Sequence, residues 1–538
     1  MSGATLMSDP QFDVCVVGSG AGGGAAAYGL ARAGYRVLVL EKGRHYRETD
    51  FVHDEVKICR RDFFVPSVFD EPHVLAKPGK PPEPTSEGWI SCCVGGGTVH
   101  MSGFFFRLRP EDFHLRSRLG PIAGADLADW PFGYETLAPY YDEVEDTIGI
   151  SGDAALERRA RPYPLAPLLA HPSAELIEKA GIKLGVSVFP TPRAVLSADY
   201  RGRPACMYCG FCGSYGCEVG AKSSSLVTFI ALAQATGKLT LRSRAHVVEV
   251  TTSPRGRADG VLYIDDTGAV QRAQARVVVL ACSPIETARL LLSSGKQGLA
   301  NSSGLVGRHL MISTAASGAG QFASPSPHFP PGAERLPFID RTVRSGDGTI
   351  LFMRPHVNPI FQAERLARRA SGGPLFGAAL KRKLKEYFVE SHTLEWESFS
   401  EYYPSAASGV TLDPEVKDRF GRAVARYRFA VHPSALGRSD ALAKIGRHMM
   451  EAAGSKRTFD RTEDRIYPML QAGTTRMGRD PKRAVLDENC QAHDVGNLYV
   501  ADGSSFPSVG GAPYTLSIMA NALRVAAEIV KRGAAADL

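Results

Sequence analysis

Apolar and small residues follow a regular order near the start of the chain. Residues 14–17 form a short apolar run, residues 21–27 are all glycine or alanine, and residues 37–40 form a second apolar run that ends at Glu41. Short continuous apolar runs are typical of buried strands in a parallel sheet, and a small-residue stretch between them suits a closely packed helix. The pattern therefore predicts a strand, a helix and a second strand, the first unit of a doubly wound α/β domain.

Three glycines lie between the first predicted strand and the body of the helix. Gly18, Gly20 and Gly23 form the pattern G-x-G-x-x-G, and Glu41 ends the second strand. Glycine lets the backbone turn tightly and approach a pyrophosphate, whose charge is stabilised by amides at the helix N-terminus. A carboxylate at the position of Glu41 accepts hydrogen bonds from ribose hydroxyls. These residues predict a dinucleotide site, but they do not separate FAD from NAD.

Two further glycine-rich segments favour FAD. Residues 94–103 (VGGGTVHMSG) contain a second glycine turn, in a place where simple NAD domains have none. Near the C-terminus, a strand is followed by Asp502, a glycine turn and a helix that runs to about Val530. A helix N-terminus directed at the pyrimidine side of an isoalloxazine would stabilise the anionic reduced flavin through its dipole. The sequence therefore predicts a flavin site.

Composition and charge narrow the class of protein. The chain has 538 residues, of which 44% are hydrophobic, so it can bury a large core, and we expect two structural domains. A net charge of +7 is modest for this size and does not indicate nucleic-acid binding. The first residues lack the features of a secretory signal, so we expect a cytoplasmic address, with export beside a partner subunit left open. No transmembrane helix is predicted, because the uncharged stretch 503–523 is rich in turn residues.

Several segments resemble the glucose-methanol-choline (GMC) family of FAD oxidoreductases over most of the chain. They are residues 129–145 (DWPFGYETLAPYYDEVE), 277–292 (VVVLACSPIETARLLL), 304–310 (GLVGRHL), 473–478 (GTTRMG) and 497–507 (NLYVADGSSFP). The resemblance implies an α/β fold, in which a Rossmann-like FAD-binding domain carries an inserted substrate domain on a mostly antiparallel sheet. The expected boundaries are 1–115, 200–312 and 480–538 for the FAD-binding domain, and 116–199 and 313–479 for the substrate domain.

The same resemblance implies which residues hold the cofactor. Family members oxidise alcohols or sugars by passing a hydride to flavin N5. The adenosine half of FAD is assigned to Gly18, Gly20, Gly23 and Glu41, with Val247 near the adenine, and the flavin half to Gly95, Gly96, Gly97 and Asp502. His100 lies in the second glycine turn, where some relatives attach the flavin covalently. Covalent attachment and simple packing beside the dimethylbenzene ring both remain open for His100.

Four cysteines fall within residues 206–217 (CMYCGFCGSYGC). Cys206, Cys209, Cys212 and Cys217 have the spacing C-x2-C-x2-C-x4-C. Compact cysteine runs of this kind can wrap one iron-sulfur cluster, whereas structural zinc sites usually separate two C-x-x-C pairs by a longer stretch. An iron-sulfur cluster is the favoured interpretation; zinc, a disulfide and unligated thiols remain open.

The cysteine run also resembles that of a GMC subgroup, the catalytic subunits of bacterial FAD-dependent sugar and gluconate dehydrogenases. Those subunits carry a three-iron cluster on three cysteines, at places that correspond roughly to Cys206, Cys212 and Cys217. Here the last gap is one residue longer and Cys209 is additional, so both 3Fe-4S and 4Fe-4S clusters are considered. A cluster beside the flavin implies a dehydrogenase that passes electrons to a redox protein or a quinone, rather than an oxidase.

The catalytic positions of the family are altered in this chain. Alignment by motif puts Leu470 where the family has a histidine base, and Pro513 and Tyr514 where it has asparagine and proline. If the base has moved, the candidates are His392, His100, His432, Tyr402 and Tyr403.

Three functions follow from these observations. The first is an FAD-dependent dehydrogenase of alcohols or sugars, with electrons relayed through the cluster. The second is a desaturase or enone reductase that acts on a carbon-carbon bond next to a carbonyl, with Tyr514 as the acid or base. The third is a non-catalytic electron-transfer subunit. A basic stretch, residues 365–385, is either a solvated surface or a contact with a redox partner or a membrane surface.

Overall fold

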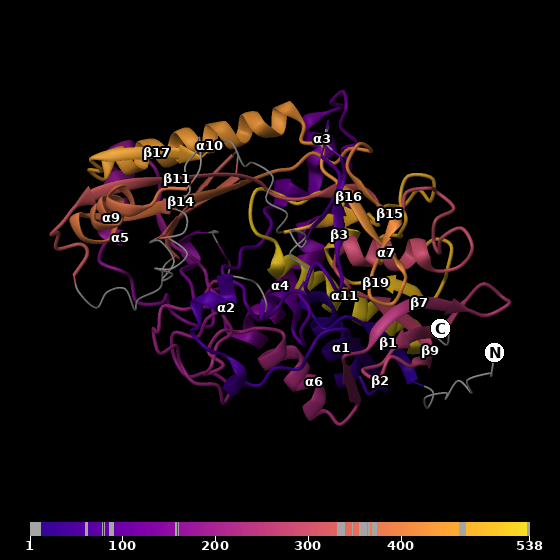
Figure 1. Cartoon of the computed structure of the whole chain (residues 1–538). Helices are drawn as coiled ribbons and strands as arrows, with labels where there is room; N and C mark the ends of the chain where they lie inside the picture. The colour runs from indigo at the N-terminus through magenta and orange to yellow at the C-terminus, as the bar shows by residue number, and fades with distance from the viewer. Residues whose placement is uncertain are drawn as a thin grey trace.

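The computed structural model describes residues 12–534, apart from short gaps, and shows three β-sheets with helices packed against them (Figure 1). The gaps are residues 60–62, 78, 80, 86–90, 157–158, 160, 331–338, 347, 354–362, 364–365, 368–373 and 462–469. Part of the basic stretch 365–385 therefore lies outside the described residues.

The predicted strand-helix-strand unit is confirmed. The strands β1 (Phe12–Val17) and β2 (Val37–Glu41) are parallel neighbours, and the helix α1 (Ala21–Arg32) connects them. All five residues of β2 are buried, as expected for a sheet that is covered on both faces. Helix α11 (Thr515–Ala534) packs on α1 and brings the C-terminal segment to the same layer.

These elements form a seven-stranded sheet in the lower right of Figure 1. Its parallel part has the order β6-β2-β1-β9-β19, and β8 and β7 extend β9 as an antiparallel meander. The remaining strands are β6 (Leu239–Ser243), β7 (His246–Thr252), β8 (Ala258–Ile264), β9 (Val270–Leu280) and β19 (Leu498–Val500). Segments from both ends of the chain and its middle therefore meet in one Rossmann-like sheet, which confirms the predicted fold class.

A second sheet of six strands is mixed in direction. Its order is β18-β10-β15-β16-β3-β4, and only the β16 and β3 pair is parallel. The strands are β3 (His73–Leu75), β4 (Glu83–Thr85), β10 (Arg308–Met311), β15 (Gly409–Lys417), β16 (Ala423–Arg428) and β18 (Ala472–Thr474). Helix α7 (Pro284–Ser293) packs on β15 and β16, and this contact connects the mixed sheet to the nucleotide-binding sheet.

The third sheet is fully antiparallel and lies in the upper left of Figure 1. Its strands, in spatial order, are β17 (Arg457–Arg461), β11 (Thr314–Ala323), β14 (Ser391–Ser400), β13 (Gly348–Met353), β12 (Ile339–Ser345) and β5 (Phe189–Pro190). We call it the antiparallel sheet. It matches the sheet expected for the substrate domain, while the predicted domain boundaries stay a prediction.

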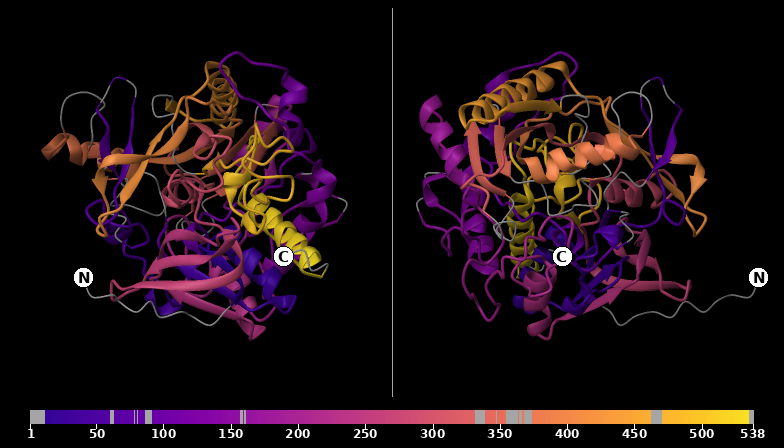
Figure 2. Two further views of the ribbon diagram at one scale, coloured as in Figure 1. Left: turned by 90° about the vertical axis from the view of Figure 1, so that its right-hand side faces the viewer. Right: turned by 60° about the vertical axis from the view of Figure 1, so that its left-hand side comes forward.

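One face of the antiparallel sheet is covered by α10 (Pro433–Ala452) and α5 (Ala174–Leu184), as two further views show (Figure 2). Leu394 and Trp396 of β14 point to this face and are buried with α10. Gly446 makes room for the indole, since a Cβ there would lie 2.5 Å from the Trp396 ring. Because side chains alternate along a strand, Glu395, Glu397 and Phe399 point to the opposite face.

The other helices are short or lie at the surface. They are α2 (Glu55–Cys59), α3 (Leu115–Leu119), α4 (Tyr134–Ile148), α6 (Ala231–Ala235) and α9 (Gly377–Lys385). Among the residues that the structure describes, no helix combines the length and the apolar character needed to span a bilayer.

Candidate active site

A single large cavity runs from the nucleotide-binding sheet to the antiparallel sheet. Its volume is about 1180 Å³, above the roughly 300–1,000 Å³ that is usual for one small ligand. One end is lined by the glycine turn after β1, and the other end by side chains of β11 and β14. The predicted cofactor residues Gly18, Gly20, Glu41, Gly96, Gly97, His100, Val247 and Asp502 all line this cavity.

The glycines after β1 leave no room for side chains. Gly18 has a φ of +94°, in the left-handed region that favours glycine. A Cβ at Gly23 would lie 1.9 Å from the carbonyl oxygen of Gly18, and a Cβ at Gly22 would lie 1.9 Å from that of Ala501. Gly23 therefore supports the turn from behind, while the backbone at the start of α1 faces the cavity and fits a pyrophosphate. Gly22 was not singled out from the sequence, although it stands within the motif.

Glu41 lies at the end of β2 with both carboxylate oxygens engaged. Oε2 accepts hydrogen bonds from the Ser19 amide (3.1 Å) and hydroxyl (2.7 Å), and Oε1 accepts one from the Gly43 amide (2.9 Å). Burial raises the pKa of Glu41, although these hydrogen bonds oppose the shift. The Ser19 hydroxyl also accepts a hydrogen bond from the Gly95 amide (3.0 Å), so the two glycine turns are joined at this point.

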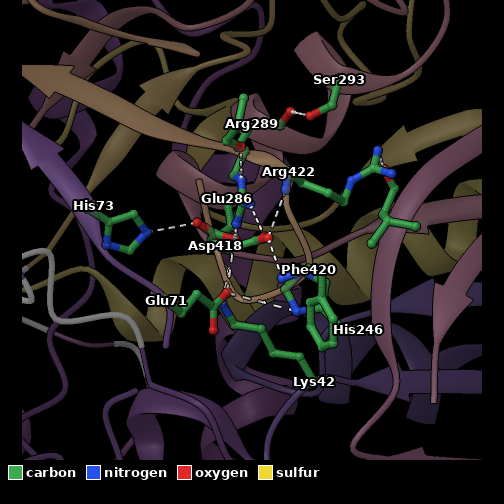
Figure 3. Close-up of polar contacts among 12 residues, drawn as sticks. Lys42, Glu71, His73, His246, Glu286, Arg289, Ser293, Asp418, Phe420 and Arg422 are labelled. Carbon is green, nitrogen blue, oxygen red and sulfur yellow. Dashed lines mark hydrogen bonds and ion pairs between the residues drawn. The ribbon is translucent and has the colours of Figure 1, made fainter. Parts of the chain in front are cut away.

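A buried network of charged residues stands beside the adenosine end of the cavity (Figure 3). Lys42 Nζ lies 2.7 Å from Glu71 Oε1 and 3.5 Å from Glu286 Oε2, and His73 Nε2 lies 2.8 Å from Glu286 Oε1. Burial opposes ionisation of Glu286, but the charges of Lys42 and Arg289 hold its pKa well below the usual value. The network joins the residue after Glu41 to β3 and α7.

The same network reaches the mixed sheet through Arg289. Arg289 Nη2 lies 2.5 Å from Asp418 Oδ2, and Arg289 Nε donates a hydrogen bond to the Ala423 carbonyl (2.9 Å). Nearby, burial lowers the pKa of His246 to about 4, so that this imidazole is neutral at physiological pH. Oppositely charged groups are therefore paired where the nucleotide-binding and mixed sheets meet, and this pairing offsets the cost of their burial.

The flavin half of the cavity is built from the second glycine turn and the turn after β19. A Cβ at Gly96 would lie 2.8 Å from the Cα of Gly20, and Gly96 has a φ of +55°. Gly95 does not line the cavity; its φ of +93° turns the chain instead. Asp502 accepts hydrogen bonds from the Ser504 amide (2.8 Å) and the Thr287 hydroxyl (2.6 Å), and so fixes its turn to α7.

His100 is held in the cavity wall. Its Nε2 lies 2.6 Å from the Ser91 hydroxyl, and its ring stacks on Phe64 with a centroid separation of 5.0 Å. The His100 carbonyl accepts a hydrogen bond from the Ser214 amide (2.8 Å), which belongs to the cysteine-containing loop. This placement agrees with a residue that packs beside the flavin.

Tyr514 and Leu470, which occupy the altered family positions, meet in the cavity wall. The Tyr514 hydroxyl donates a hydrogen bond to the Leu470 carbonyl, and the Tyr514 side chain is fully buried. Burial, and then the charge of Glu401, raise the pKa of Tyr514 well above its usual value. A phenol in this state stays protonated at neutral pH, so it is a poor base.

The other candidate bases lie away from the cavity. His392 is on the α10 face of the antiparallel sheet and stacks on Phe329 with a centroid separation of 4.5 Å and an interplanar angle of 2°. Because neighbouring β14 residues alternate in direction, His392 points away from the cavity, and its catalytic role stays a prediction. His432 precedes α10 and accepts a hydrogen bond from the Ser434 amide (3.2 Å), and Tyr402 donates one to the Ala430 carbonyl (3.0 Å).

The cysteine-containing loop, residues 206–217, does not form a metal site in the structure. Cys206, Cys209, Cys212 and Cys217 are half-buried free thiols, and in the described part of the chain no three His, Cys, Asp or Glu side chains are arranged to hold a metal ion. The described residues therefore give no support for the expected iron-sulfur cluster, which stays a prediction.

A buried lysine holds this loop together instead. Lys222 Nζ donates hydrogen bonds to the carbonyl oxygens of Cys212 (2.7 Å), Tyr215 (2.6 Å) and Met101 (3.0 Å). Burial lowers the pKa of Lys222 to about 8. Spacing in the sequence could not reveal this residue, because its partners are backbone atoms from two separate segments.

The antiparallel sheet contributes residues that the sequence analysis did not single out. Glu395 and Glu397 of β14 line the cavity, together with Phe399. Their signal is the alternation of polar and apolar residues in HTLEWESF, which is typical of a strand with one solvated or ligand-facing side.

The fold and the cavity define the class of protein: a Rossmann-like sheet supplies a dinucleotide cradle, and a second sheet closes a large pocket against it. Family models support the same class: GMC oxidoreductase models match residues 93–315 and 404–522, and an NAD(P)-binding Rossmann-like domain model matches residues 16–54. The chain belongs to the GMC oxidoreductase family, and it is an FAD-dependent oxidoreductase of the kind that acts on alcohols or sugars.

Relatives cover nearly the whole chain. It is 31% identical to 6'''-hydroxyparomomycin C oxidase of Streptomyces lividus, over 98% of this chain and 93% of that protein. It is also 31% identical to 2-methyl-1,2-propanediol dehydrogenase of Mycolicibacterium austroafricanum, over 98% and 96%. Fructose dehydrogenase large subunit of Gluconobacter japonicus is 27% identical over 98% and 99%. The crystal structure of pyridoxine 4-oxidase from Mesorbium loti shares the fold, with a TM-score of 0.65 and 17% identity over 96% of this chain and 99% of that one.

Proposed function

We propose that this protein is a dehydrogenase that oxidises a hydroxyl group of a small polar substrate. The observation that carries the proposal is the single cavity, which joins the cradle for FAD to a polar wall on the antiparallel sheet. Relatives named for an aminoglycoside, paromamine, a diol and fructose support a hydroxyl-bearing substrate. When bound, FAD supplies the hydride acceptor.

Residues of this chain would bind the cofactor and limit the access of water to the cavity. Gly18 turns the chain and donates its own amide to the Leu40 carbonyl (2.8 Å), so the backbone amides of Gly20 and Gly22 are the ones that would face the pyrophosphate. Glu41 offers a carboxylate to the ribose. Phe399 and Leu470 belong to an apolar cluster at the other end of the cavity, where they limit the entry of water. A hydroxyl group between this cluster and the cofactor would face the polar side chains of β14.

Anaerobic reduction of the bound FAD tests the proposal. The purified holoenzyme is mixed with paromamine, 2-methyl-1,2-propanediol and fructose in turn, and loss of the oxidised flavin absorbance is followed. We expect at least one hydroxyl compound to reduce the flavin, and deuterium on its carbinol carbon to slow the reduction, because the C–H bond breaks in that step. Failure of all hydroxyl compounds, with FAD still bound, would contradict the proposal.

A second candidate function rests on Tyr514. A protonated phenol in the wall of the cavity is suited to donate a proton to carbon while hydride is delivered to the neighbouring carbon of an enone. Reoxidation of chemically reduced enzyme by an enone such as cyclohexenone, with no reduction by alcohols, would favour this reaction. A flavin that is neither reduced by alcohols nor reoxidised by enones would favour an electron-transfer subunit.

The electron acceptor is a separate question. The spacing of the four cysteines supports an iron-sulfur relay to a redox protein or quinone, whereas the loop geometry does not. Iron and acid-labile sulfide in anaerobically purified protein decide between them. Three or four irons per chain with matching sulfide would support the relay, and the absence of iron with intact FAD would leave electron transfer to the flavin alone.

A surface next to the cavity supports contact with a partner. Lys383 and Tyr387 line the cavity, and the neighbouring side chains of Phe376 and Val389 are 81% and 62% exposed. Basic residues of α9 lie beside these exposed apolar groups. Such a combination suits a redox partner or an anionic membrane surface.

A further inference from the structure

The cavity needs a base that the altered family positions do not supply. Leu470 has no ionisable group, and the Tyr514 hydroxyl is a bound donor. His392 points to the opposite face of its sheet, and His100 Nε2 is already engaged by the Ser91 hydroxyl (2.6 Å). Oxidation of an alcohol nevertheless releases a proton from its hydroxyl group. The following inference rests on the proposed function, because it assigns the acceptor of that proton.

Glu397 lies on the cavity side of β14, in the centre of the antiparallel sheet. Its neighbours across the sheet are Ser317 of β11 and Leu351 of β13, and neither side chain is charged. The next residue on the same face is Phe399, about 7 Å along the strand. Phe399 packs in the same apolar cluster as Leu470, and Glu397, Phe399 and Leu470 all line the cavity. Glu397 therefore borders the same cavity as the position where the family carries its base.

The carboxylate of Glu397 faces the open cavity. In the part of the chain that the structure describes, no hydrogen bond or ion pair engages this carboxylate. The residue is half-buried and lines the cavity. A carboxylate that already paired with an arginine or lysine would be held as a permanent anion and would accept a proton poorly. Glu397 is therefore available to a substrate group.

The surroundings of Glu397 suit proton transfer near neutral pH. Burial, and then the charge of Glu395, raise its pKa to about 7. The charged or titratable groups that line this end of the cavity from other elements are Arg457 and Asp460 of β17, Lys383, Glu386 and Tyr387 of the α9 region, and Tyr514 beside α11. A base is most effective when its pKa lies near the working pH, since it is then both deprotonated and basic enough.

We propose that Glu397 is the catalytic base of this enzyme. When bound, oxidised FAD would supply the acceptor of a hydride and its two electrons. The Glu397 carboxylate accepts the proton of the substrate hydroxyl as the C–H bond of the hydroxyl-bearing carbon breaks and its electron pair leaves as that hydride. The alcohol becomes a carbonyl compound, and Glu397 holds the proton until it is released to solvent.

The test compares Glu397→Gln with wild type as loaded holoenzymes. The amide keeps the size of the side chain but cannot accept the proton. We expect the limiting rate of anaerobic flavin reduction to fall roughly 100- to 10,000-fold. The dissociation constant of an unreactive analogue, the methyl ether of the reacting alcohol, should change less than about threefold, as measured by the flavin difference spectrum. Glu390→Gln, at an exposed position just before β14, is the matched control and should react as wild type does.

The dependence on pH supplies a second readout. In wild type the limiting rate should rise with pH, with a midpoint near 7, because the deprotonated carboxylate is the active form. The profile should become flat in Glu397→Gln. In Glu395→Gln the midpoint should move to lower pH, since a neighbouring negative charge is removed. An infrared carboxyl band that titrates with the same midpoint, and that Glu397→Gln abolishes, measures the group without turnover.

Two results would overturn the proposal. One is a Glu397→Gln enzyme that reduces its flavin at the wild-type limiting rate but binds the methyl ether more weakly, which would make Glu397 a binding residue. The other is a pH profile that stays unchanged in that variant. If no alcohol reduces the flavin of the wild-type enzyme, the proposed function itself fails. That measurement on wild type comes before any variant is made, so the two failures are distinguishable.

Discussion

The hydroxyl of Tyr514 donates a hydrogen bond to the backbone carbonyl of Leu470, so the two altered family positions are joined directly in the cavity wall. Leu470 has a φ of +57°, a left-handed conformation that is rare for leucine. The hydrogen bond engages the carbonyl of that unusual residue. Tyr514 therefore shapes the cavity wall, and its hydroxyl proton is already engaged in a hydrogen bond.

Replacement of Tyr514 distinguishes a structural role of this residue from a role as an acid or base. In Tyr514→Phe we expect the limiting rate of flavin reduction by an alcohol to fall less than about tenfold, because the phenol is not the base. Loss of the buried hydrogen bond should lower the free energy of unfolding by about 1 kcal/mol, measured by denaturant titration. A rate loss above a hundredfold with FAD retained would instead favour Tyr514 as an acid or base.

The ribose contact can be tested at Glu41. Glu41→Gln removes the negative charge that should accept hydrogen bonds from the ribose hydroxyls. We therefore expect the dissociation constant for FAD to rise at least tenfold. Fluorescence of released FAD measures this constant. Glu48→Gln, at an exposed position in the turn after β2, serves as control, and equal affinities in the two variants would contradict the assignment.

Close backbone packing makes a strong prediction at Gly22. In Gly22→Ala the new methyl group would lie 1.9 Å from the Ala501 carbonyl oxygen, so the start of α1 must shift. We expect a loss of stability of about 1–3 kcal/mol and a lower FAD content. The matched control is Gly437→Ala in α10, where a methyl group meets nothing within 4 Å. That variant should be more stable than wild type by about 0.5–1 kcal/mol, because alanine favours helix.

The buried network around Glu286 should make the protein sensitive to acid. The pKa of Glu286 in the folded protein lies well below the usual 4.5, so the unfolded chain binds a proton that the folded chain does not. The stabilisation is therefore complete above about pH 5 and is lost as pH falls below 4.5 toward the folded value.

Thermal unfolding between pH 6 and 3 measures this effect. Wild type should lose stability more steeply with falling pH than Glu286→Gln, whose side chain does not titrate. The variant should be less stable at pH 6, because Lys42 and Arg289 then lose a partner. Parallel pH curves for the two proteins would show that this carboxyl does not couple folding to protons.

The cofactor cradle could be predicted because its signals are local. Gly18, Gly20 and Glu41 lie within one strand-helix-strand unit, and the steric demands of that unit are met by residues close in sequence. The glycine turn at Gly96 and the turn at Asp502 were readable for the same reason. In each case a short peptide must adopt one conformation, and few residue types permit it.

The four cysteines show what cannot be predicted from local sequence. Their spacing suits a cluster, yet it says nothing about whether the Sγ atoms converge. The fold adds a contact that spacing cannot show, because Lys222 is buried against carbonyls of Cys212, Tyr215 and Met101, in segments about a hundred residues apart. His392 and Glu397 differ in the same way, since a pair of positions on one strand points to opposite faces.

The sequence by itself determined the nucleotide-binding unit, the flavin class and the loss of the family base at Leu470. Only the tertiary structure decided which polar groups of the antiparallel sheet line the cavity. Strand β14 lies in the centre of its sheet because β11 and β13 pair with it from distant parts of the chain, and this register turns Glu397 toward the cavity and His392 toward Phe329. The physical reason is that conformational preferences act between neighbours in sequence, whereas a reaction site is assembled by packing across the whole chain.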